Sequence, residues 1–300
     1  LMDNAVEYDV VIFMTYLYAT TTMGLPIVAG QVPTILQPTA HDEPAAYVDY
    51  FQSVFRQPDA FVFFTTEERE IVRRLYRIEP RGHVIGIGIE ESTETSDSQS
   101  EFQKFGLESR QFLVYVGRID ESKGVGELLR FFREYQNRNS TGLKLVLAGE
   151  PLMSIPRSED VVVTGFLSES EKSTILRDCL ALVQPSYFES FSIVLCEAWK
   201  QRRPALVQGR CEVLRGQSLR SNGALPYEGF AQFETCLNYL VSNPDIADGM
   251  GRNGHMYVET NYNWDVVLER MESTIEDAKK AFQSRLQTTP LRLERNPPDR

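Results

Sequence analysis

Short apolar runs recur along the chain, and most lack the polar–apolar alternation that a half-exposed strand would show. Residues 9–14, 60–64 and 112–116 are examples. Uninterrupted apolar runs are typical of strands buried on both faces of a parallel sheet. Segments with helical spacing separate the runs, so the pattern predicts an α/β fold with doubly wound parallel sheets and right-handed crossovers.

The expected elements fall into two series. In the first, strands are expected at residues 9–14, 33–37, 60–64 and 83–87, and helices at residues 45–57 and from residue 66 onward. In the second, strands are expected at 112–116, 143–148, 161–164, 179–183 and 205–207, and helices at 126–136, 168–177 and 192–201 and over most of 228–283. A capping-box pattern, Ser168 with Glu171, marks the start of one of these helices.

A segment without apolar residues, 90–101, has the composition of a linker. We therefore expect an incomplete amino-terminal Rossmann-like domain with its linker at 1–100 and a complete carboxy-terminal one at 101–265. A terminal helix and a flexible tail are expected at 266–300. The Pro- and Arg-rich stretch 288–300 is expected to be disordered.

No charged residue occurs between Asp9 and His41, which raises the question of a membrane span. A spanning helix needs about 20 mostly apolar residues. Threonine, glycine and proline interrupt this stretch, so a buried strand–helix–strand unit is favoured and no transmembrane segment is expected. No basic segment precedes the stretch, which argues against a signal peptide.

Composition adds two restrictions. A net charge of −11 and a pI of about 5.0 argue against nucleic acid as a partner. The four cysteines are not grouped in pairs, so neither a zinc site nor a disulfide framework is indicated. We expect a cytoplasmic protein, either free or peripheral at a membrane.

The first candidate motif is a loop after a predicted strand, residues 117–124. Gly117 allows close approach of backbone to a ligand, while Arg118 and Lys123 supply cations that suit phosphate oxygens. A helix amino terminus follows and adds partial positive charge. The loop therefore predicts a diphosphate clamp; the alternative is a solvated turn in which Arg118 pairs with Asp120.

The second motif, residues 185–197, holds two glutamates eight positions apart. Glu189 follows a predicted strand, and Glu197 lies in the mainly apolar helix that follows. Ser192 is a natural N-cap, which would leave backbone amides at residues 190–193 able to bind an anion. A carboxylate can accept hydrogen bonds from the vicinal hydroxyls of a sugar or ribose. A structural glutamate bonded to backbone is the alternative for Glu197.

Three further positions follow predicted strands. Gly149 and Phe166 could flank a nucleotide base, or they could belong to ordinary tight turns. His41 follows a first-domain strand and could serve the site, although most single histidines are structural. No metal-binding, Walker A or serine-hydrolase motif is present in the sequence, so we expect no metal and no cofactor.

Taken together, these loops resemble the family 4 retaining glycosyltransferases of the GT-B fold. The resemblance rests on Gly117-Arg118 with Lys123-Gly124, on Gly149, on Gly165-Phe166, and on Pro185-Ser186 with Glu189, Phe191 and Glu197-Ala198. It implies two Rossmann-like domains facing across a cleft. It also implies metal-independent transfer of a sugar from a nucleotide-diphosphate sugar, with retention, to a glycan, lipid or small-molecule acceptor.

The resemblance implies a role for each candidate. Arg118 and Lys123 would hold the diphosphate, Glu189 the sugar hydroxyls and Glu197 the ribose. The other implied donor contacts are Gly117, Gly149, Phe166 near the base, and the segment Ser190, Phe191, Ser192 and Ile193. His41 would reach the donor sugar near the reacting carbon.

The sequence also departs from the family pattern. Ser192 stands where glycine commonly follows Phe191, and residues 209–223 replace a common Gly-Gly-containing loop. The chain begins in what we interpret as mid-domain, so a fragment, or a partner chain that supplies the rest of the amino-terminal domain, are alternatives. A non-catalytic nucleotide-sugar-binding subunit and a GT-B nucleotide-sugar epimerase are the competing functions.

Overall fold

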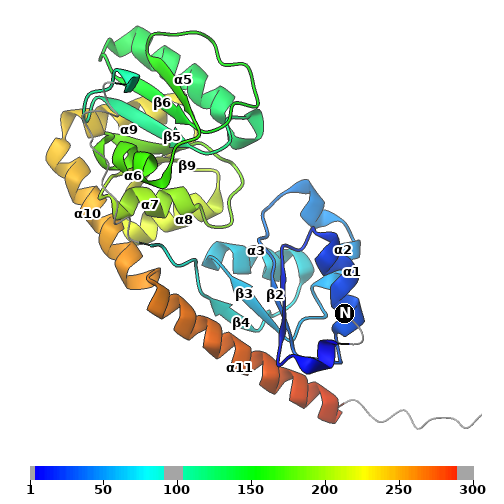
Figure 1. Cartoon of the computed structure of the whole chain (residues 1–300). Helices are drawn as coiled ribbons and strands as arrows, with labels where there is room; N and C mark the ends of the chain where they lie inside the picture. The colour runs from blue at the N-terminus through cyan, green and yellow to red at the C-terminus, as the bar shows by residue number, and fades with distance from the viewer. Residues whose placement is uncertain (1–3, 91–103, 289–300) are drawn as a thin grey trace, which may run out of the picture. The chain divides into compact units, whose positions relative to one another are not determined.

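The computed structural model describes residues 4–90 and 104–288 (Figure 1). The chain divides into two compact units, Leu1–Ile85 with Leu268–Arg300, and Gly86–Val267. The predicted linker lies almost entirely outside the described residues, and so does most of the predicted disordered tail.

The first unit is built on four parallel strands in the order β1-β2-β3-β4. Their bounds are β1 Val11–Met14, β2 Thr34–Gln37, β3 Ala60–Phe63 and β4 Gly82–Val84. The helical elements are η1 Ala5–Glu7, α1 Ala19–Val28, η2 Pro44–Tyr47, α2 Tyr50–Val54 and α3 Thr66–Tyr76, joined by the part of α11 from Leu268 onward. Helices α1 and α2 lie side by side next to this sheet (Figure 1).

The predicted strand–helix–strand unit over the uncharged segment is confirmed by β1, α1 and β2. In the part of the chain that is described, no helix is long and apolar enough to cross a membrane. The expectation that the first strand is buried on both faces is wrong. In β1, Phe13 is buried while its neighbour Met14 is 57% exposed, so the face that carries Met14 is open.

The single amphipathic helix expected at 45–57 is also wrong. The segment forms the short helix η2 and then α2, because Val48 adopts an extended conformation with φ −74° and ψ 125° between them. By contrast, the helix expected from residue 66 forms as α3. The side chain of Thr65 accepts a hydrogen bond from the backbone N–H of Glu68 and so caps its first turn.

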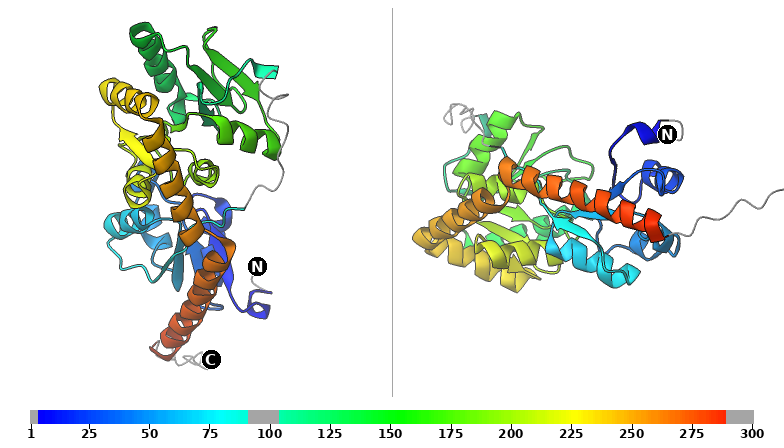
Figure 2. Two further views of the ribbon diagram at one scale, coloured as in Figure 1. Left: turned by 90° about the vertical axis from the view of Figure 1, so that its left-hand side faces the viewer. Right: turned by 90° about the horizontal axis from the view of Figure 1, so that it is seen from below.

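The second unit contains six parallel strands in the order β10-β9-β8-β5-β6-β7. The strands are β5 Phe112–Val116, β6 Lys144–Ala148, β7 Val161–Gly165, β8 Ala181–Gln184, β9 Ala205–Gln208 and β10 Ala224–Tyr227. The helices are η3 Glu121–Lys123, α5 Val125–Asn139, α6 Glu169–Asp178, α7 Ile193–Lys200, α8 Glu212–Ser221, α9 Phe230–Ser242, α10 Pro244–Asn261 and the start of α11, Trp264–Thr288. Figure 2 shows α10 and α11 as successive helices. The strand order reverses between β5 and β8, which makes the sheet doubly wound as expected.

Strand β10 and helix α8 were not predicted, and neither was the short helix η3. Strand β10 contains Pro226, which usually argues against a strand, but β10 is an edge strand where proline is tolerated. Helix α8 contains a glycine and occupies the segment that was interpreted as a variant loop. The capping box is confirmed: Ser168 and Glu171 exchange hydrogen bonds between side chain and backbone at the start of α6.

The core of the second unit brings α7 and α10 into close contact. The Trp199 side chain is fully buried, and its indole N–H donates to the carbonyl oxygen of Gly223 at 2.9 Å. A Cβ at Gly254 of α10 would lie 2.2 Å from Trp199, so only glycine permits this approach. Helix α7, which carries Glu197, is therefore packed closely against α10.

Candidate functional site

The site lies where the strand order of the large sheet reverses. In open α/β sheets, ligands bind at the carboxyl ends of the strands beside such a reversal, here between β5 and β8. A cavity of about 170 Å³ occurs at this position. Six of the residues predicted from the sequence line it: Gly117, Arg118, Lys123, Glu189, Ser192 and Ile193.

An ion pair joins the two predicted motifs across this cavity. The Nζ of Lys123 lies 2.9 Å from Oε1 of Glu189, and both side chains are largely withdrawn from solvent. Asp120 positions the lysine by accepting a hydrogen bond from its backbone N–H at 3.1 Å. A hydrogen bond from Ser122 is the largest cause that lowers the pKa of Asp120. The loop is therefore shaped to aim Lys123 at the β8 side.

The same loop requires glycine at its end. Gly124 has φ +76°, and a Cβ there would lie 2.4 Å from the carbonyl oxygen of Pro185. Gly124 therefore allows the Lys123 loop to approach the loop that carries Glu189.

Arg118 is the exposed member of the site. Its side chain is 65% exposed, and Nε lies 3.9 Å from Asp120, the pairing anticipated as an alternative. The hydroxyl of Tyr115 donates to the Arg118 carbonyl oxygen at 2.6 Å. The backbone of Arg118 is thus fixed while its guanidinium extends into solvent at the cavity.

Glycines terminate three neighbouring strands. The N–H of Gly149 donates to the carbonyl of Gly165 at 2.9 Å, and a Cβ at Gly149 would lie 2.0 Å from the carbonyl oxygen of Gly117. Gly149 therefore serves the close packing of these strand ends. Phe166 follows Gly165 and is 83% exposed, without lining the cavity. Contact of Gly149 or Phe166 with a ligand stays a prediction.

The segment before α7 differs from its expected form. Ser192 occupies the N-cap position, but its side chain does not bond to the amides of α7. It accepts a hydrogen bond from Nε2 of Gln184 instead. Phe191 is 2% exposed and packs edge-on against Tyr262, with ring centroids 4.8 Å apart. Neither Phe191 nor Ser190 lines the cavity, so their contact with a ligand stays a prediction.

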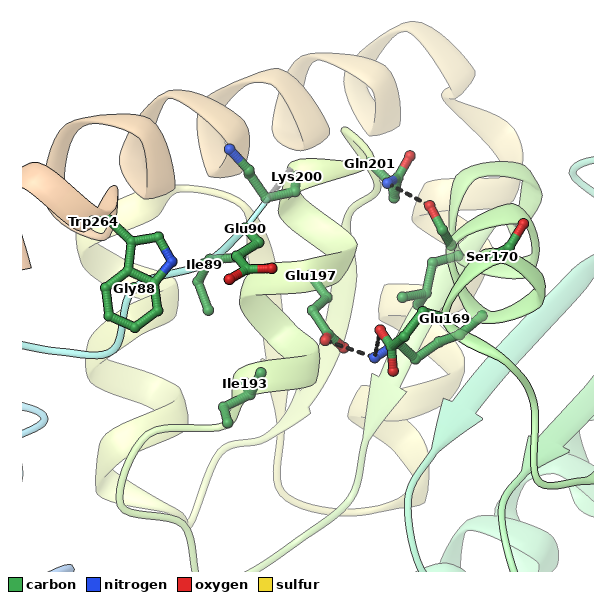
Figure 3. Close-up of a pocket in the computed structure, with 13 residues that line it drawn as sticks. Gly88, Ile89, Glu90, Glu169, Ser170, Ile193, Glu197, Lys200, Gln201 and Trp264 are labelled. Atoms are coloured by element: carbon green, nitrogen blue, oxygen red, sulfur yellow. Dashed lines mark hydrogen bonds and ion pairs between the residues drawn. The ribbon is translucent and has the colours of Figure 1, made fainter. Parts of the chain in front are cut away.

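A second cavity, of about 470 Å³, adjoins the first and contains Glu197 (Figure 3). Ile193 lines both cavities. The carboxylates of Glu169 and Glu197 each lie 2.8 Å from Nζ of Lys172. Burial alone would lower the pKa of Lys172, but hydrogen bonds to Glu169 and Glu197 outweigh it and raise the pKa. Lys172 therefore fixes the position of the Glu197 side chain at the wall of this cavity.

Lys172 was not singled out from the sequence. It lies on α6, far from Glu197 in sequence, within a Glu-rich helix that has the pattern of a solvated face. Nothing in the local pattern indicates that this lysine turns inward.

His41 follows β2 in the first unit, and its Nδ1 lies 3.4 Å from Oε1 of Glu43. The adjacent backbone is held by Glu68, whose fully buried carboxylate accepts the N–H groups of Ala40 at 2.9 Å and Phe64 at 2.7 Å. Burial raises the pKa of Glu68 to about 8, against the effect of these hydrogen bonds. Glu68 was also missed, because its partners are backbone groups of two other loops.

Among residues 4–90 and 104–288, no group of three or more His, Cys, Asp or Glu side chains could hold a metal ion.

A doubly wound sheet with cations, carboxylates and a helix start at its strand reversal is an arrangement typical of nucleotide-binding domains. The pattern of the glycosyl transferases group 1 family matches residues 97–254. The chain belongs to this family, and its two parallel sheets are those of the GT-B fold.

Curated relatives agree with this assignment. The chain is similar to alpha-D-kanosaminyltransferase of Streptomyces kanamyceticus, with 26% identity over 258 residues, which cover 77% of this chain and 65% of the relative. It is also similar to D-inositol 3-phosphate glycosyltransferase of Rhodococcus opacus (strain B4), with 28% identity over 244 residues. These residues cover 74% of this chain and 54% of the relative. The chain thus spans about half to two thirds of the length of these relatives.

Among solved structures, Anabaena Alr3699/HepE in complex with UDP has a similar fold. The TM-score is 0.76 at 14% identity, and the match covers 92% of this chain and 80% of that one.

Proposed function

We propose that the protein is a retaining, metal-independent glycosyltransferase of family 4 that transfers a sugar from a nucleotide-diphosphate sugar. The observation that carries the proposal is the Lys123–Glu189 ion pair at the β5–β8 reversal, directly beside the cavity that contains Glu197. A donor of this class has a diphosphate between a sugar and a ribose. The site offers two cations and one carboxylate in one cavity and a second carboxylate in the adjoining cavity, which suits the groups of such a donor.

Arg118 and Lys123 are assigned to the diphosphate. Lys123 is a point charge fixed by its loop, and Arg118 is exposed and able to fold onto phosphate oxygens. When the bond between sugar and diphosphate breaks, negative charge grows on the leaving phosphate. Cations already in place stabilise that charge without reorganisation.

The two glutamates are assigned to opposite ends of the donor. Glu189 lies in the same small cavity as the cations, so it is placed to accept hydrogen bonds from sugar hydroxyls. Glu197 lies in the neighbouring cavity beside Lys172 and is assigned to the ribose hydroxyls. Lys172 donates a hydrogen bond to Oε1 of Glu197 and so orients the side chain that is assigned to the ribose.

The remaining assignments rest on the family resemblance. His41 would act near the reacting carbon, the backbone of residues 190–193 would contact phosphate or sugar, and Phe166 would lie near the base. The acceptor would be a glycan, a lipid or a small molecule, and the compartment the cytoplasm.

The proposal is tested by incubating the protein with UDP-, GDP-, ADP- and dTDP-sugars and a set of candidate acceptors. We expect release of one nucleoside diphosphate together with a glycoside whose anomeric configuration, read by NMR, equals that of the donor. An inverted product would contradict retention. Conversion of the donor into another nucleotide sugar without acceptor would identify an epimerase, and binding without any turnover would identify a non-catalytic subunit.

A further inference from the structure

Ser192 adopts a backbone conformation in which a Cβ is sterically disfavoured. Its φ is 70° and its ψ is 82°, in the left-handed region. Glycine would adopt this conformation freely. The serine also leaves the amides of α7 uncapped by its side chain. Strained residues of this kind concentrate at functional sites, which directs attention to what the Ser192 hydroxyl does.

The hydroxyl of Ser192 is held by Gln184, the last residue of β8. Nε2 of Gln184 donates to Oγ of Ser192 at 3.0 Å. Gln184 is 5% exposed, and within the described part of the chain its Oε1 has no hydrogen-bond partner. Both residues line the 170 Å³ cavity. A buried amide with one unpaired atom is unfavourable, so this arrangement is a second sign, independent of the backbone, that the cavity wall is built for a ligand.

The direction of the Gln184 bond determines what Ser192 can do. A hydroxyl has one hydrogen to donate and two lone pairs that accept. Since Oγ accepts from Gln184, the hydroxyl hydrogen is available for another acceptor. Lys123, Arg118, the start of α7 and Glu189 line the same cavity. The two cations and the helix start outweigh the single carboxylate and favour a negatively charged acceptor.

We propose that Ser192 donates a hydrogen bond to the phosphate that carries the sugar, and that Gln184 is the positioning residue that orients its hydroxyl. The inference rests on the proposed function and adds a side-chain contact where the family pattern commonly has glycine. The sugar-bearing phosphate is chosen over the ribose-bearing one because Ser192 shares its cavity with Glu189, whereas Glu197 lies in the neighbouring cavity.

The test compares Ser192→Ala and Ser192→Gly by calorimetry with UDP, GDP, ADP and dTDP and with the four monophosphates. Alanine keeps the backbone strain and glycine removes it, while both remove the hydroxyl. We expect both variants to bind the preferred diphosphate about tenfold or more weakly, the scale of a hydrogen bond to a charged group. Binding of the matching monophosphate should change less than about twofold. Ser140→Gly is the matched control, since Ser140 is also left-handed, with φ 44°, and lies outside the cavity.

Diphosphate affinity within about twofold of wild type in both variants overturns this inference and leaves the proposed function standing. Equal losses for diphosphate and monophosphate also overturn it, because they indicate a general disturbance of the site. If the wild-type protein binds none of the four diphosphates, the proposed function and this inference both fail. Melting curves establish that each variant is folded.

Gln184→Met tests the positioning role, since methionine has a similar length and removes the donor. We expect a smaller loss of diphosphate affinity than in Ser192→Ala, and no further loss when Gln184→Met is combined with Ser192→Ala. Losses that add in full would show that Gln184 does not act through Ser192.

Discussion

Lys123 of the β5 loop and Glu189 of the β8 loop form an ion pair with 2.9 Å between Nζ and Oε1. The pair joins two segments 66 positions apart in sequence. In the proposed complex the lysine lies between the diphosphate and the sugar, and Glu189 turns to the sugar hydroxyls. Several of the following measurements test this arrangement.

Removal of either cation should weaken the diphosphate contact. Lys123→Ala or Arg118→Ala is expected to cost about 1.5–3 kcal/mol in nucleoside-diphosphate binding, the range of a charge-assisted hydrogen bond. Calorimetry measures this, with Lys280→Ala on α11 as a control for loss of one positive charge at an exposed position. Unchanged affinity in both site variants would remove this loop from the site.

Lys172 should act through Glu197. Lys172→Met leaves a largely buried carboxylate without its cation, so we expect about 1–3 kcal/mol of lost stability and weaker nucleoside-diphosphate binding. Glu197→Gln added to Lys172→Met should restore part of the stability, because the unpaired charge is gone. Lys280→Met is the control, since Lys280 and its partner Asp277 both have exposed side chains. Denaturant unfolding that shows no recovery in the double variant would contradict the pairing.

Glu68 should make stability depend on pH. Its pKa is raised from 4.5 to about 8 by burial, so the folded state holds its proton more tightly than the unfolded state. The stabilisation is therefore fully present below about pH 4.5 and is lost as the pH rises through about 8. Denaturant unfolding from pH 5 to 9 should show wild type losing stability relative to Glu68→Gln. Glu70→Gln, on the exposed side of the same helix, should parallel wild type, and identical pH slopes for Glu68→Gln and wild type would contradict the assignment.

Turnover should not depend on a divalent metal. We expect EDTA to change the rate by less than about twofold, because the proposed charge stabilisation comes from Arg118 and Lys123. Loss of turnover in EDTA and recovery with manganese or magnesium would contradict metal independence.

Local patterns in the sequence were sufficient for much of the fold. The uninterrupted run at β5 and the capping box at Ser168 each set an element without help from distant residues. The predictions were wrong where contacts with other parts of the chain determine the local structure. Pro226 is accommodated because β10 lies at the sheet edge, and the segment around Val48 breaks where an amphipathic pattern predicted one helix.

Some residues of the site could likewise be predicted from local sequence, and others could not. Gly117, Lys123 and Glu189 could be predicted because parallel strands bring their carboxyl ends to one edge. Gln184, Lys172 and Glu68 could not be predicted, because each acts through groups that only the folded chain brings near. Ser192 is the N-cap residue of α7 as expected, but it makes no side-chain cap, and its Oγ accepts a hydrogen bond from Gln184 instead.

The central claim is that Glu189 meets the sugar of the donor and Glu197 meets the ribose. The most direct measurement compares Glu189→Gln with Glu197→Gln for two quantities, calorimetric affinity for the free nucleoside diphosphate and turnover of the intact donor. Free nucleoside diphosphate has no sugar for Glu189 to contact, so Glu189→Gln should lower turnover and leave that affinity nearly unchanged. Glu197→Gln should weaken the free diphosphate and the intact donor alike.

Melting curves on both variants separate these effects from unfolding. If Glu189→Gln weakens binding of the free nucleoside diphosphate more than Glu197→Gln does, with both proteins folded, the assignment of the two glutamates is contradicted.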